Sequence, residues 1–213
     1  MKTSEYRREA RIALTGNLGW AILILLVYSA IMSFASSFSI GIGTIIITGA
    51  LTAGLCRAFL GLLRSKRLEF NDLFSFFNQN FVNALVMGLL QTVFVFLWSL
   101  LFLIPGIVAS YSYSMAPYIL ADYPELNGSD AITVSKKLMQ GKKGRLFCLH
   151  FSFIGWILLS ILTFGILLFV YVEPYMQTAQ AAFYESIKHE VPAFLPEGIG
   201  MNDNNNNNHT ESV

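Results

Sequence analysis

Four polar side chains lie within long apolar stretches of this chain: Glu173, Tyr111, Tyr113 and Gln91. If those stretches cross a membrane, a carboxylate inside one of them is costly and points to a function. Pro174 directly follows Glu173 and interrupts its helix, and interrupted helices form ion and substrate sites in transporters. The four residues therefore predict a polar pocket. The alternative is that Glu173 lies among the outer headgroups and that Gln91 only joins neighbouring helices.

Signatures of catalysis, metal binding and nucleotide binding are missing from the sequence. It holds no HExxH, no GxSxG and no paired carboxylate motif, and intramembrane chemistry needs such convergent groups. The run GKKG at Gly141 to Gly144 lacks the spacing of a phosphate loop. Cys56 and Cys148 are too few for a disulfide framework. We therefore predict no enzyme activity, no catalytic residue, no metal and no cofactor.

Membrane helices are the elements that must position the four polar residues. The 213 residues are 54% hydrophobic and 13% charged, whereas soluble domains are about 25% charged. A hydrocarbon core of about 30 Å needs about 20 helical residues to cross it. The apolar runs predict an all-α polytopic membrane protein with six transmembrane helices, over Asn17–Phe38, Gly41–Leu63, Phe81–Leu103, Pro105–Asp122, Leu146–Thr163 and Ile166–Tyr184.

Basic residues give the predicted orientation of these helices. Of the 14 Lys and Arg residues, only Arg57 lies inside an apolar run, and all the others fall on one side of the predicted membrane. Cytosolic loops carry the excess of Lys and Arg, so we expect a plasma-membrane protein with both termini in the cytosol. Arg57 is close enough to the inner end of its run for its side chain to reach the headgroups.

The segment between the fourth and fifth runs is the most basic part of the chain. Asn127 to Gly141 predicts a short amphipathic helix that lies on the cytosolic membrane surface. We expect this segment to bind anionic headgroups of the lipid bilayer and no nucleic acid. The alternative is that its basic residues only set the orientation. These residues are Lys136, Lys137, Lys142, Lys143 and Arg145.

The runs recur at a regular spacing. The first, third and fifth begin about 64 residues apart, at Asn17, Phe81 and Leu146. This spacing favours three tandem hairpins, although slight identity between the units leaves chance as the alternative. We expect residues 1–190 to form the transmembrane domain. Residues 191–213 are rich in Asn and predict a disordered cytosolic tail.

Three strings of the chain resemble a known family. They are IPGIVASYSYSMAPYILADYP from Ile104, SKKLMQGKKGRLFCLHFSFIGW from Ser135, and Pro174 and Tyr175 followed by AAFYESI. They are similar to the bacterial integral-membrane family catalogued as domain of unknown function 975. The resemblance covers nearly the whole chain up to about Lys188. It implies a bacterial plasma membrane and carries over no catalytic residue, because the family has no established activity.

Two functions remain open from the sequence. A non-enzymatic membrane component, such as an assembly, stress or signalling partner, is favoured because nearly all residues are spent on apolar helices and short turns. The alternative is a small transporter or permease-like protein with a polar pocket near Glu173. Convergence of Glu173, Tyr111, Tyr113 and Gln91 on one cavity would favour the transporter.

Overall fold

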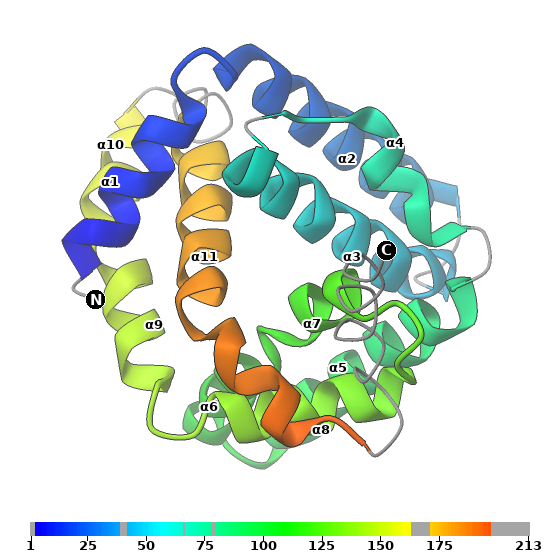
Figure 1. Ribbon diagram of the computed structural model, residues 1–213. Coiled ribbons are helices and arrows are strands. Elements are labelled where there is room, and N and C mark those ends of the chain that lie inside the picture. The colour runs from blue at the N-terminus through cyan, green and yellow to red at the C-terminus, as the bar shows by residue number, and fades with distance from the viewer. Residues whose placement is uncertain (1–2, 39–41, 66, 78–79, 163–170, 197–213) are drawn as a thin grey trace, which may run out of the picture.

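The computed structural model describes residues 3–38, 42–65, 67–77, 80–162 and 171–196, and these residues form helices and no strand (Figure 1). The prediction of an all-α protein is confirmed. The helices in chain order are α1 (Thr3–Leu14), α2 (Leu18–Phe38), α3 (Ile42–Ser65), α4 (Phe70–Phe74), η1 (Ser75–Phe77), α5 (Phe81–Leu101), α6 (Leu103–Tyr113), α7 (Ala116–Asp122), α8 (Gly128–Leu138), α9 (Lys143–Phe151), α10 (Ile154–Leu162), α11 (Glu173–Ile187) and η3 (Lys188–Phe194).

Three of the described helices are long and apolar enough to cross a membrane. They are α2, α3 and α5, and the qualifying stretches are Leu18–Ser36, Ile47–Ser65 and Phe81–Leu101. All three coincide with predicted spans to within a few residues. Of the six predicted spans, three are therefore supported by the length and composition of a described helix.

The fourth and fifth predicted spans are each divided into two shorter helices. Span four is α6 followed by α7, with a break at Ser114 and Met115. Pro117 stands in the first turn of α7, and it has no N–H to donate to the carbonyl of Tyr113 four residues earlier. Span five is α9 followed by α10. Residues 163–170, which include the end of the fifth predicted span and the start of the sixth, lie outside the described part of the chain.

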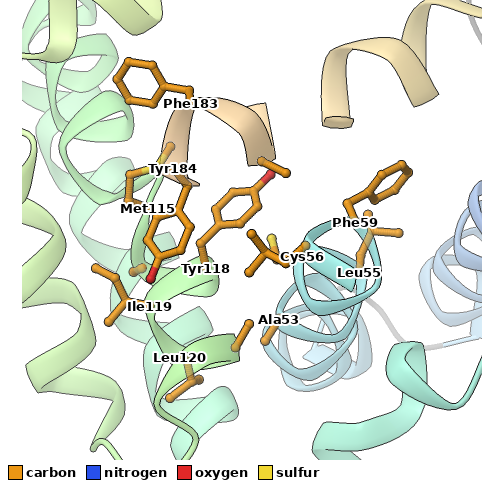
Figure 2. Close-up of a cluster of buried hydrophobic side chains, with 14 of the residues drawn as sticks. Ala53, Leu55, Cys56, Phe59, Met115, Tyr118, Ile119, Leu120, Phe183 and Tyr184 are labelled. Atoms are coloured by element: carbon orange, nitrogen blue, oxygen red, sulfur yellow. The ribbon is translucent and has the colours of Figure 1, made fainter. Parts of the chain in front are cut away.

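The core forms where α3, α7 and α11 meet inside a ring of the other helices (Figure 1). α3 packs against α2, α4, α5, α7 and α11, and α11 packs in turn against α1, α2 and α9. Phe59 of α3, Leu120 of α7 and Phe183 of α11 are fully buried there (Figure 2). A single interior cluster therefore links the N-terminal helix to the last one.

Small residues set close helix crossings on α3. Its small-residue face consists of Gly49, Ala50, Ala53 and Gly54, whose helical spacing is typical of helices that pack closely. A Cβ added to Gly49 would lie 2.1 Å from the Ala84 carbonyl oxygen of α5. One added to Gly54 would lie 2.1 Å from the Leu73 carbonyl oxygen of α4. Only glycine allows backbones to approach this closely, so these positions fix how α4 and α5 lie on α3.

The predicted surface helix is α8, but its apolar stripe is covered by protein. Ala131, Val134 and Leu138 are buried, and α8 packs against α5, α6, α7 and η3. The chain leaves α8 through Gly141 at a φ of 72°, as the sequence predicts. This correction arises because the apolar face of a helix fits a membrane surface and a protein core equally well. Contact between its lysines and lipid stays a prediction.

The predicted tail begins inside a described element. Val191 is buried, and residues 191–194 belong to η3, which packs against α8 and α11. The predicted boundary at residue 190 therefore falls within a packed helix. Residues 197–213, which include the Asn-rich run, lie outside the described residues.

Candidate functional site

Glu173 begins α11, and its carboxylate faces residues that the sequence did not indicate. Its Oε1 accepts a hydrogen bond of 3.1 Å from Gln177 Nε2. The carboxylate also lies within electrostatic range of the phenols of Tyr28 on α2 and Tyr118 on α7. Glu173 is partly buried, and the phenols known to lie within electrostatic range of it differ from the predicted ones.

The two tyrosines predicted to join Glu173 have other partners. Tyr111 Oη and His150 Nδ1 are 3.1 Å apart, which joins α6 to α9. The Tyr113 ring lies against Phe94 of α5, with centroids 5.9 Å apart. The two side chains stand two residues apart on one helix and so point in different directions. Tyr111, Tyr113 and Glu173 therefore have different described partners.

Gln91 lines a cavity formed by described residues. This cavity, called the polar cavity below, has a volume of about 510 Å³ and lies between α3, α5, α6 and α7. It contains none of Glu173, Tyr111 and Tyr113. Its lining residues are Thr48, Gly49, Thr52, Met87, Gly88, Gln91, Thr92, Val95, Phe96, Ser99, Ser110 and Pro117.

Hydroxyl and thiol groups gather next to Glu173 in the core. Tyr118 of α7 is fully buried, stacks on Tyr184 at 5.4 Å between centroids, and lies beside the Cys56 thiol of α3 (Figure 2). Its hydroxyl has no well-aligned hydrogen-bond partner among the described residues. Tyr28 and Thr52 are within hydrogen-bonding reach of each other at the edge of this group. No sequence pattern indicates this cluster, because its members come from four helices, α2, α3, α7 and α11.

Arg64, at the end of α3, joins three helices through charged hydrogen bonds. Its Nη1 and Nη2 donate to the two Asp122 carboxylate oxygens at 2.7 and 2.8 Å, and its Nε donates to Glu185 at 2.6 Å. Tyr184 Oη donates to Asp122 at 3.0 Å, and Lys188 Nζ lies 2.7 Å from Glu185. This group, called the Arg64 clamp below, ties α3, α7 and α11 together. Paired donors on both carboxylate oxygens make such a contact strong and directional.

The five basic residues predicted to bind lipid have unequal surroundings. Lys136 and Lys137 are exposed on α8, and Lys143 is half-buried. Lys142 forms an ion pair with Glu190 of η3, and this ammonium lowers the pKa of the Glu190 carboxyl. Arg145 donates to Tyr6 Oη of α1 at 2.6 Å. Two of the five therefore also hold elements of the protein together.

Arg57 has a partner that the sequence did not indicate. Its Nε lies 3.4 Å from Asp72 Oδ1 of α4. Burial raises the pKa of the Asp72 carboxyl, and the Arg57 charge partly offsets that rise. Arg57 therefore links α4 to α3. Contact between Arg57 and the headgroups stays a prediction. The acidic residues of all these pairs were overlooked because only Lys and Arg carry orientation information.

The described residues offer groups that can bind a ligand. Among the described residues, no three metal-ligating side chains lie close together. The absence of a metal from the whole protein stays a prediction from the sequence. Within the described part of the chain, the polar cavity and the cluster beside Glu173 bring polar side chains together at apolar depths. The polar cavity contains hydrogen-bonding groups that a ligand can use, whereas the cluster beside Glu173 is buried in the core.

Comparisons with known proteins identify a family and no activity. No curated protein and no solved structure matches this chain. A family model described as "Protein of unknown function (DUF975)" matches residues 1–109 and residues 100–191. The two matches together include every helix from α1 to α11. The chain therefore belongs to the family of unknown function DUF975.

Proposed function

We propose that this protein is a multi-pass component of the bacterial plasma membrane, with six spans, both termini in the cytosol and no enzymatic activity. The observation that carries the proposal is a broad exposed apolar surface, centred on two helices that hold no charged residue. Soluble monomers rarely expose large continuous apolar areas. Lipid is the environment in which such a surface is stable.

The exposed apolar surface is richest on α5 and α6, which pack together as a hairpin. Phe102 and Ile104 near its tip are 69% and 75% exposed. Neither helix contains a charged residue. Further exposed apolar side chains lie on α2, α9 and α10: Trp20, Leu23, Leu26, Phe34, Phe147, Phe151, Ile154 and Leu158.

The divided helices are compatible with crossing a membrane. A helix of about 20 residues, the length of Leu103 to Asp122, rises about 30 Å. Irregular backbone is tolerated at membrane depth where protein covers it. Met115 and Ala116, at the break, are both buried. α6 and α7 together therefore meet the physical requirements of a fourth span.

A role as an assembly, stress or signalling partner fits the described groups better than transport does. The sequence-based case for a transporter depended on one pocket formed by Glu173, Tyr111, Tyr113 and Gln91. The described contacts distribute these residues over separate neighbourhoods. The Arg64 clamp also braces α3, α7 and α11, which a rigid membrane component needs.

Cysteine labelling in intact cells tests this proposal. In a background in which Cys148 is replaced by Ser, Ser36→Cys and Phe102→Cys report the predicted outer side. Ser65→Cys and Lys137→Cys report the predicted cytosolic side, and all four positions are exposed. We expect an impermeant maleimide to label only the first two until the cells are opened. Labelling of Lys137→Cys from outside would overturn the topology.

A further inference from the structure

The polar cavity has a mostly apolar surface, into which a few hydrogen-bonding groups and no charged group project. Its polar lining consists of hydroxyls and the Gln91 amide, and none of its lining residues is ionisable. The Gln91 amide makes no hydrogen bond to any described residue. Thr92 and Ser110 donate to the Gly88 and Ile107 carbonyls of their own helices, which leaves their oxygens available as acceptors. The cavity therefore offers both donors and acceptors to a ligand.

Access to the cavity is from the side that faces lipid in the proposed topology. Phe96, which lines it, is 68% exposed, and Thr92 is exposed on the same helix. Gln91 lies ten residues into α5, about 15 Å from the start of that helix. Ser99 lies close to the end of α5 at the predicted outer side. The cavity thus runs from the middle of the bilayer toward the outer leaflet.

We infer that the polar cavity binds an uncharged amphiphile, a molecule with a small hydroxyl-bearing head and a hydrocarbon chain. The inference rests on the membrane embedding proposed above. A volume of about 510 Å³ is within the about 300–1,000 Å³ of small-molecule sites. The head would bond to Gln91 and the neighbouring hydroxyls, and the chain would leave past Phe96.

A charged ligand is disfavoured at this site. Moving a phosphate or ammonium group from water into an apolar region is costly unless an opposite charge receives it. The lining offers no such charge. A hydroxyl head loses far less solvation, and each of its hydrogen bonds can be replaced within the cavity. The lack of charge therefore selects against ordinary phospholipids.

Photocrosslinking of the full chain in liposomes tests this inference. The probe is a diacylglycerol with a diazirine in its acyl chain, in vesicles of phosphatidylglycerol and phosphatidylethanolamine. We expect crosslinks to concentrate on the lining segments of α3, α5 and α6. Unlabelled diacylglycerol should displace the probe, whereas added phosphatidylglycerol should not.

Matched variants show whether the polar groups bind the head. Gln91→Leu should lower crosslinking about fivefold, the effect of losing one neutral hydrogen bond. Gln180→Leu makes the same change on α11, outside the cavity, and should leave it unchanged. If Gln91→Leu lowers the melting temperature of the protein, Thr92→Val, which removes a hydroxyl at nearly constant volume, provides the test in its place.

Two results would overturn the inference. The first is crosslinking that is spread evenly over the lipid-facing side chains, or that neither Gln91→Leu nor Thr92→Val reduces. The other is equal displacement by phosphatidylglycerol. Cysteine labelling of the same liposomes reports insertion separately, so loss of the membrane topology is distinguishable from loss of the ligand.

Discussion

Two regions of this molecule are held together by different forces. In the Arg64 clamp, one guanidinium binds carboxylates from α7 and α11. In the apolar hairpin of α5 and α6, backbones approach so closely that a Cβ on Gly106 would lie 2.8 Å from Ser99 Cα. Charged hydrogen bonds stabilise contacts near water, whereas close packing of small residues stabilises contacts between helices in lipid. The proposed membrane placement predicts this contrast, with the clamp near the headgroups and the hairpin in hydrocarbon.

The most severe test of this contrast places a charge on the hairpin. Leu89 is exposed on α5, and Leu89→Arg should make membrane insertion less favourable by about 3 kcal/mol. The inserted fraction, measured by alkaline extraction of membranes, should fall accordingly. Leu89→Met is the control and should insert normally. Normal insertion of the Arg variant would mean that this face of α5 does not contact lipid.

The crossing of α3 and α5 connects the two regions, and its disruption has the next largest effect. Gly49→Ala places a methyl group against the Ala84 carbonyl oxygen, and such overpacking costs about 1–3 kcal/mol. We expect a lower melting temperature in detergent. Gly19→Ala on α2 is the matched control, because a Cβ there meets nothing within 4 Å. Equal stability of the two variants would contradict the described crossing.

Removal of one charge from the Arg64 clamp tests its contribution to stability. Asp122→Asn should destabilise the protein by about 2 kcal/mol, because a hydrogen bond between charged partners is lost. Asp122 has a side chain only 15% exposed, so water compensates poorly. Glu125→Gln removes an exposed carboxylate nearby and should have no effect. Denaturation in detergent, followed by circular dichroism, measures the difference.

The smallest effect concerns the pair of Lys142 and Glu190. Because Lys142 lowers the pKa of Glu190, the pair stabilises the folded state above the ordinary glutamate pKa of about 4.3. The contribution is lost as the pH falls from the ordinary glutamate pKa through the lowered pKa of Glu190 in the folded protein. We expect less than about 1 kcal/mol, because the pair is partly exposed. Glu190→Gln should remove this part of the acid sensitivity of η3, measured by hydrogen exchange.

The sequence alone determined where the three longest apolar helices lie. The predicted run Asn17–Phe38 is α2 (Leu18–Phe38), and the run from Phe81 begins α5 at the same residue. Such runs are local properties, because every backbone group of a helix bonds within its own segment. The small-residue face of α3 was likewise visible, since helical spacing places its members on one side.

Only the tertiary structure decided which side chains meet. Arg64 reaches partners 58 and 121 residues away, and Lys142 reaches one 48 residues away. The phenols within electrostatic range of Glu173 include those of Tyr28 and Tyr118, which the sequence did not indicate. Composition and periodicity give the depth of a residue along its helix. The rotation of each helix and its choice of neighbours depend on contacts between distant segments, such as the crossing at Gly49, which no local pattern contains.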